Sequence, residues 1–482
     1  MSSSNPERPN LVVIVSDDQG PWALGCAGNR EIVTPCLDGL AAAGTRLSNF
    51  YCTSPVCSPA RASLLTGWMP SKHGIHDALS GPMSGPEAPV FLPEQSGYAT
   101  DLAHAGYNCA MIGKWHLGAS DRPHSGFEHW FVLEGGGSDY WHLPMFRRAA
   151  RVDVDGYATD VFADAAVQFV HDSMHDSRPF CLNLWFTAPH SPWVGVHPQH
   201  WVDLYRDCPF ESCPQESPHP WTRSPAQNFF EYRQAIANPI PSLVGYFAAV
   251  TAMDAAIARV VDSLDRLDIL ESTVVVFLSD NGFSAGHHGV WGKGNATVPQ
   301  NMFENSVRVP AIFSQPGRIV AGSLRSELVS GYDLRPTLLA LAGVSDPEPE
   351  VMPGKSIMPL LTGGTGGHDR IVVFSEYGPT RMIRYGEWKY VHRYPYGPHE
   401  LYNLKEDAEE RRNLVGDASQ RELASSLREM LADWFVRFGD PRLDGAKEAV
   451  TGRGQAGLVG PRGKGREAFE REEREPFAVD PW

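Results

Sequence analysis

Several features that define large classes of protein are absent from this sequence of 482 residues. No apolar run is long enough to cross a bilayer, and the polar start of the chain, MSSSNPERPN, shows no secretory leader. Net positive charge is absent too. The formal net charge of −16 disfavours nucleic acid, whose phosphates require a basic surface. We therefore expect a cytoplasmic protein whose partners include neither a membrane nor a nucleic acid.

Regular cysteine spacing is also absent. The eight cysteines form no Cys-x-x-Cys pair and no even framework, and several fall within expected strands. Without an evident export signal, this usage predicts reduced thiols rather than disulfides. Apolar residues make up 42% of the chain and charged residues 20%, which is typical of a globular protein.

Short apolar runs alternate with amphipathic segments along most of the chain. The runs predict strands buried on both faces of a parallel sheet, at 11–15, 108–112, 179–186 and 273–278. The segments between them predict helices, at 34–44, 158–172 and 246–267. This alternation indicates an α/β fold with a large, mostly parallel sheet flanked by helices.

The pattern changes toward the C-terminus. Alternating segments up to residue 404 predict antiparallel strands with a turn at Tyr385-Gly386, followed by a helix over 417–438. The length exceeds one ordinary core. We expect a catalytic domain at 1–365, a smaller sheet-and-helix domain at 366–440 and an extended tail at 441–482, which in a homo-oligomer would embrace a neighbouring subunit. The aperiodic stretch 195–242 predicts a surface excursion that shapes a substrate pocket.

Polar residues follow each of the four expected parallel strands. The strand ends read Ser16-Asp17-Asp18-Gln19, Gly113-Lys114-Trp115-His116, Thr187-Ala188-Pro189-His190 and Ser279-Asp280-Asn281-Gly282. Ligands of open α/β sheets bind beyond the carboxyl ends of strands, so we expect these ends to converge. Three carboxylates and an amide would repel each other there unless a hard cation, Ca²⁺ or Mg²⁺, joined them. One such ending alone is typical of a turn, but two matching endings favour a metal site.

The stretch VCSPARASLLTGWMP (56–70) places a cysteine where a short helix is expected to begin. Ser58 is a good N-cap and Pro59 suits the first helical position. Cys57 would then lie near free backbone N–H groups, which favour an anion or an activated nucleophile. Arg61, one turn further along the same face, would hold that group or an anionic oxygen.

These motifs together resemble the sulfatase family. The matching segments are SDDQG (16–20), CSPAR with LLTG (57–67), GKWHLG (113–118), APH (188–190), SDNG (279–282) and GKGN (292–295). The resemblance, which runs from about residue 9 to about residue 415, implies an alkaline-phosphatase-like fold and hydrolysis of a sulfate ester. It implies that a formylglycine-generating enzyme converts Cys57 to formylglycine and that Asp17, Asp18, Asp280, Asn281 and the modified Cys57 hold one Ca²⁺. It places Arg61, Lys114, His116, His190 and Lys293 at positions that bind and polarise the ester.

The aldehyde hydrate explains why a converted cysteine is needed. One hydroxyl attacks the sulfur, and the second expels sulfate when a base removes its proton. An unconverted thiol has no second hydroxyl, so its attack would leave a stable thiosulfate-type ester on the enzyme. We expect His116 to be this base and His190 or Lys293 to protonate the leaving oxygen.

Two other functions fit parts of the pattern: a formylglycine-dependent phosphonate or phosphate ester hydrolase, and a non-catalytic binding protein that keeps the fold. The two cationic groups in GKWHLG favour sulfate, and every expected catalytic residue type is present. Our preferred substrate is a sulfated sugar. The aromatic residues that could stack on its ring are Trp130, Tyr140, Trp141, Trp193 and Trp201.

Overall fold

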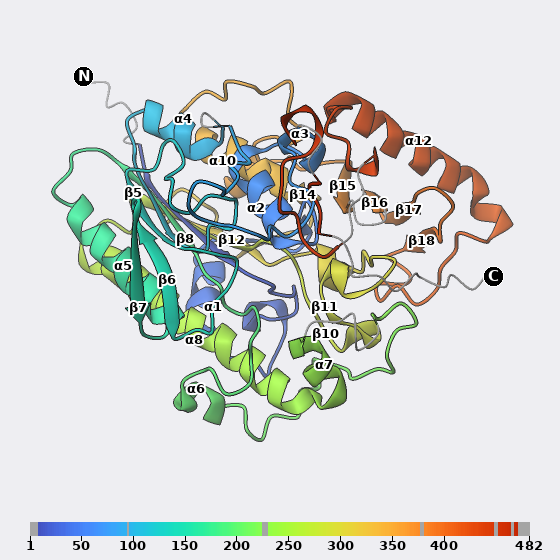
Figure 1. Cartoon of the computed structure of the whole chain (residues 1–482), viewed down its shortest axis with the longest axis horizontal. Helices are drawn as coiled ribbons and strands as arrows, with labels where there is room; N and C mark the ends of the chain where they lie inside the picture. The colour runs from blue at the N-terminus through green and yellow to red at the C-terminus, as the bar shows by residue number, and fades with distance from the viewer. Residues whose placement is uncertain are drawn as a thin grey trace.

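The structure is a computed structural model of the chain, and it describes residues 8–93, 96–223, 230–375, 380–447, 452–463 and 467–470. Its main body is built on a ten-stranded sheet with helices on both faces (Figure 1). A four-stranded antiparallel sheet and a long helix form a smaller lobe, orange to red in Figure 1. The expected α/β fold with a second, smaller sheet is confirmed, while the domain boundaries remain a prediction.

The large sheet has the strand order β13-β2-β12-β9-β1-β8-β4-β5-β6-β7. Its strands are β1 (Asn10–Ser16), β2 (Thr45–Leu47), β4 (Asn108–Gly113), β5 (His129–Leu133), β6 (His142–Arg147), β7 (Ala150–Asp155), β8 (Phe180–Trp185), β9 (Thr273–Ser279), β12 (Ala311–Ser314) and β13 (Ser323–Arg325). The five central strands, β9, β1, β8, β4 and β5, are parallel, so their carboxyl ends meet at one edge. These include all four strands that the sequence predicts.

Alternating side chains of β1 enter two different cores. Val13 packs in the cluster that contains residues of α2 (Cys57–Thr66), α4 (Tyr98–His104) and α10 (Leu334–Leu341). Ile14 packs in the cluster that contains residues of α1 (Pro35–Ala42), α5 (Ala158–Ser173) and α8 (Pro239–Arg266). Burial on both faces explains why the run LVVIV is continuously apolar.

Helix α8 is the longest helix of the described chain, and it begins at Pro239, seven residues before the predicted start. N–H groups in the first turn of a helix have no intrahelical acceptor, so proline, which has no N–H group, loses no hydrogen bond there. By length and composition alone α8 is apolar enough to cross a membrane. In the structure 78% of its most apolar window is buried, because α8 is a core helix that packs against the sheet.

The smaller sheet consists of β15 (Arg370–Ser375), β16 (Thr380–Tyr385), β17 (Trp388–Arg393) and β18 (Glu400–Asn403), each antiparallel to the next. Tyr385 pairs with Trp388 across the predicted turn, where Gly386 takes a φ of 57°. Helix α12 (Arg421–Phe438) covers one face of this sheet. Strand β17 also sends Lys389 into a buried ion pair with Glu304 of the main body, which joins the two lobes.

Shorter elements complete the fold. The remaining strands are β3 (Phe50–Tyr51), β10 (Ser284–Ala285), β11 (Trp291–Gly292) and β14 (Val329–Ser330). The remaining helices are α3 (Pro70–His73), α6 (Gln199–Asp203), α7 (Phe230–Ala237), α9 (Glu304–Val307) and α11 (Met358–Leu361). Short 3₁₀ turns lie at Gly25–Ala27, His287–Gly289, Gly294–Ala296, Gly331–Asp333, Ala418–Gln420, Gly445–Lys447 and Gly460–Gly463. The excursion 195–242 therefore contains α6, α7 and the first turn of α8.

Candidate active site

The paired strands β1 and β9 bring the acidic residues together. Ser16 lies opposite Ser279 in the parallel register, so the residues that follow the two strands are neighbours in space. The backbone N–H of Asp18 donates to Asp280 Oδ1 over 3.3 Å. One carboxylate oxygen from each of Asp17, Asp18 and Asp280 lies within 4.8 Å of the others. The structure thus brings the two acidic strand ends to one point, as expected.

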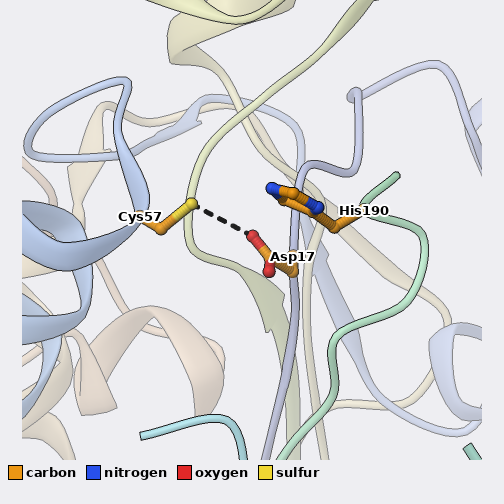
Figure 2. A group of neighbouring side chains, drawn as sticks. All are labelled: Asp17, Cys57 and His190. Atoms are coloured by element: carbon orange, nitrogen blue, oxygen red, sulfur yellow. Dashed lines mark hydrogen bonds between the residues drawn. The ribbon is translucent and has the colours of Figure 1, made fainter. Parts of the chain in front are cut away.

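Cys57 faces this point from the first residue of helix α2 (Figure 2). Its Sγ donates to Asp17 Oδ1 at 3.3 Å, and Lys293 Nζ donates to the same sulfur at 2.6 Å. Burial, reinforced by the charge of Asp17, raises the pKa of the thiol to about 12. An unconverted Cys57 is therefore protonated at neutral pH and is a poor nucleophile.

The predicted cap of helix α2 is wrong. Val56, in extended conformation, is the cap residue, and its carbonyl accepts the first helical hydrogen bond from Ala60. The hydroxyl of Ser58 instead accepts a hydrogen bond from the backbone N–H of Leu79 at 3.0 Å. Pro59 fits as the third helical residue because N–H groups of the first turn need no intrahelical partner. Cys57 still lies at the start of the helix.

Three ion pairs neutralise the carboxylates: Lys114 with Asp17, Arg61 with Asp280 at 2.8 Å, and Lys293 with Asp18 at 2.6 Å. Burial opposes ionisation of Asp17, but the charges of Lys114, His190 and Arg61 outweigh it and hold the pKa of this carboxyl well below its ordinary value. Each of the three carboxylates therefore has a cationic partner, and burial in addition raises the pKa of Asp280 to about 7. The site therefore has no excess negative charge to repel an anionic substrate.

Arg61 is completely buried, and its contacts are with protein groups. Its Nε donates to Asp280 Oδ2, and its Nη1 donates to the carbonyl of Lys114 at 3.0 Å. The sequence predicts that Arg61 binds a hydrate or sulfate oxygen. The structure gives it a supporting position, in which it fixes Asp280 and the backbone beside Lys114.

His190 and His116 occupy different environments. His190 Nε2 lies 3.7 Å from Asp18 Oδ2, and burial lowers its pKa. His116 is more enclosed. Its Nε2 donates to the carbonyl of Leu79 at 2.9 Å, because a carbonyl oxygen can only accept. This bond leaves Nδ1 as the basic nitrogen, and Nδ1 has no hydrogen-bond partner among the described residues.

Buried oxygen atoms without partners mark where a cation would fit. Asp18 Oδ2 and Asn281 Oδ1 are buried and accept no hydrogen bond from the described residues, and the two side chains are neighbours, because Asn281 Nδ2 donates to Asp18 Oδ1 at 2.8 Å. Carboxylate and amide oxygens are the ligands that Ca²⁺ and Mg²⁺ prefer. The donor set, together with Asp17 and Asp280, therefore fits such an ion.

Comparison with protein families identifies the chain. The family model described as Sulfatase matches residues 9–344, and a model described as N-sulphoglucosamine sulphohydrolase, C-terminal, matches residues 286–436. The chain belongs to the sulfatase family. It is thus a sulfuric ester hydrolase, and the family resemblance seen in the sequence motifs is confirmed.

Named relatives span nearly the whole chain. N-acetylglucosamine-6-O-sulfatase of Bacteroides thetaiotaomicron is 28% identical, covering 95% of this chain and 92% of the relative. Choline-sulfatase of Rhizobium meliloti is 29% identical, covering 90% and 88%. A solved protein in complex with its substrate D-glucosamine-2-N,6-O-disulfate superposes with a TM-score of 0.77 at 25% identity, covering 92% of this chain and 100% of that one.

Most of the candidate stacking aromatics serve the core. Trp193 is buried against Tyr232, with the ring planes 12° apart, and Trp130 donates its indole N–H to the Ser120 carbonyl. Tyr140 is also buried, and its hydroxyl donates to the backbone carbonyl of His190 at 2.7 Å, which holds that loop in place. Trp201 packs at the edge of two apolar clusters. Trp141, 40% exposed, is the one candidate whose ring is open to solvent.

Proposed function

We propose that this sulfatase hydrolyses a carbohydrate sulfate monoester, with formylglycine derived from Cys57 as the nucleophile and Ca²⁺ as the resident ion. The observation that carries the proposal is the convergence of Cys57, Asp17 and Lys293 beside buried oxygens that lack hydrogen-bond partners. Relatives that act on N-acetylglucosamine and N-acetylgalactosamine sulfates, and the solved complex with a disulfated glucosamine, support a sugar as the substrate.

Asp17, Asp18, Asp280 and Asn281 would hold the ion together with the converted residue 57. When bound, Ca²⁺ supplies charge that neutralises sulfate oxygens and acidifies a nearby hydroxyl. Lys293 stands beside the nucleophile atom, 2.6 Å from Sγ, and is placed to stabilise negative charge that develops there. An ionised hydroxyl of the hydrated residue 57 would form a bond to sulfur as the bond from sulfur to the alcohol oxygen breaks, and His190 or Lys293 would protonate that departing oxygen. His116 would then take the proton of the second hydroxyl through Nδ1, so that the carbon–oxygen bond to sulfate breaks and the aldehyde forms again.

A substrate panel tests the reaction. The chain is co-expressed with a formylglycine-generating enzyme, and mass spectrometry of the peptide that contains Cys57 measures its conversion. The converted protein is then assayed on sulfated hexosamines, an aryl sulfate, choline sulfate and a phosphate diester. We expect the highest kcat/KM on a sulfated hexosamine. A clear preference for the phosphate diester would refute the sulfatase assignment. A preference for choline sulfate would refute the proposal that the substrate is a sulfated sugar.

A further inference from the structure

Residues 452–463, near the C-terminal end of the described chain, return to the main body and lie against residues 74–91 (Figure 1). We call this segment the strap. The model that matches the C-terminal part of the chain ends at residue 436, so the strap lies beyond it. The sequence analysis expected this tail to be extended or to embrace a neighbouring subunit, whereas its described part contacts its own chain.

Gln455 is the centre of the strap and is completely buried. Its side-chain Oε1 accepts from the backbone N–H of His76 at 2.8 Å, and its Nε2 donates to the carbonyl of Gly74 at 2.9 Å. Its own backbone pairs with the same loop, donating to the carbonyl of Ala78 and accepting from the N–H of Ser80. One glutamine thus fixes the loop 74–80 through both its side chain and its main chain.

The backbone of the strap packs tightly against this loop at Gly454. A Cβ atom added to Gly454 would lie 2.5 Å from the Ser80 hydroxyl oxygen and 2.7 Å from its Cβ, so only glycine permits this approach. The N–H of Gly454 also donates to the Asp77 carboxylate at 3.2 Å. The contact is therefore specific in shape as well as in hydrogen bonding.

The loop that the strap holds reaches the active site through Leu79. The Leu79 carbonyl accepts from His116 Nε2, and the Leu79 N–H donates to the hydroxyl of Ser58, the residue after Cys57. Leu79 is also the bridge partner of Gln455. A single backbone unit therefore connects the strap to His116 and to the helix that carries Cys57.

We propose that Gln455 is a positioning residue for sulfate ester hydrolysis, which acts through the Leu79 carbonyl to fix the ring and tautomer of His116. This inference rests on the proposed role of His116 as a base. The Leu79 bond places the proton on Nε2 and so leaves Nδ1 free to accept one. Gly136 limits the ring from the other side, since a Cβ there would lie 2.4 Å from His116 Cε1. A shifted loop would therefore misplace the ring, and displacements of about 1 Å can cost on the order of 100-fold in rate.

The test is a double-mutant cycle on the full chain with Cys57 conversion measured in every variant. Gln455→Ala is expected to lower kcat at least about tenfold and to change KM by less than about threefold. In a His116→Ala background, Gln455→Ala should lower kcat by less than about twofold, because the group it positions is gone. Gln315→Ala is the matched control, since Gln315 is a buried glutamine just beyond the end of strand β12, where its Nε2 donates to the Glu271 carbonyl at 3.0 Å.

Two results would overturn the inference: wild-type kcat in Gln455→Ala, or the same loss of kcat with and without His116. Hydrogen exchange gives a readout that needs no activity. Amides of the peptide 74–81 should exchange at least about tenfold faster in Gln455→Ala than in the wild type, and unchanged exchange would overturn the proposal. If the wild-type protein hydrolyses no sulfate ester, the proposed function fails, while the exchange result still decides whether the strap orders the loop.

Discussion

Replacing Lys293 with methionine tests how much the positive charge of this side chain contributes to the rate of hydrolysis. The change keeps the length of the side chain but removes a positive charge that lies 2.6 Å from Cys57 Sγ and 2.6 Å from Asp18 Oδ1. The local charge then falls by one unit, next to the atom that must attack an anionic ester. At about 4 Å and an effective dielectric constant of about 20, one charge contributes about 4 kcal/mol, which is on the order of a 1000-fold change in rate.

We therefore expect Lys293→Met to lower kcat by about 100- to 1000-fold on the preferred sulfate ester. The assay compares variants at equal amounts of converted Cys57, so that poor maturation is not read as poor catalysis. Lys72→Ala is the control, because Lys72 is a half-buried lysine that bonds the Val351 carbonyl away from the strand ends. A kcat within about threefold of the wild type for Lys293→Met would refute the electrostatic reasoning.

Three further predictions concern other parts of the molecule. Lys114→Ala and His190→Ala should each lower kcat by about two to three orders of magnitude in the same assay, because each removes a donor beside Asp17 or Asp18, where we propose that the ester binds. Burial lowers the pKa of His197 from 6.5 to about 3, so its stabilising effect is complete above pH 6.5 and is lost as the pH falls. At pH 5 this loss is about 2 kcal/mol. Urea unfolding should therefore show that the free energy of unfolding falls between pH 7 and pH 5 by about 2 kcal/mol less in His197→Gln than in the wild type. Lys389→Met should lower the free energy of unfolding by about 3–5 kcal/mol, because it leaves Glu410 without its buried partner. Unchanged urea midpoints in Lys389→Met would contradict this.

The sequence was most informative where burial and chain direction act together. A strand such as β1, covered on both faces, must be apolar throughout, and a polar residue at its end must emerge at the sheet edge. For this reason the sequence alone predicts that the pairs Asp17-Asp18 and Asp280-Asn281 lie close together. The turn at Gly386 was predictable for a different reason. A tight turn often requires a positive φ, which glycine adopts readily, and Gly386 has a φ of 57°.

Features that depend on distant contacts were not predictable in this way. Ser58 has the chemistry of a cap, but its hydroxyl bonds Leu79, a residue that also forms a bridge with Gln455 of the strap. Arg61 lies on the expected helix face, yet the proximity of Asp280 directs its guanidinium toward protein. Gln455 carries no local signal at all. Its side-chain contacts include His76 and Gly74, which lie 379 and 381 residues earlier in the chain.

The central claim is that the ends of β1 and β9 form one cation site beside residue 57. The most direct measurement is an experimental structure of the converted protein grown with Ca²⁺. The account predicts one ion bonded to oxygens of Asp17, Asp18, Asp280 and Asn281 at about 2.3–2.6 Å, with the converted side chain of residue 57 in contact with it. An ion bound elsewhere, or these four residues without one at saturating Ca²⁺, would contradict the account.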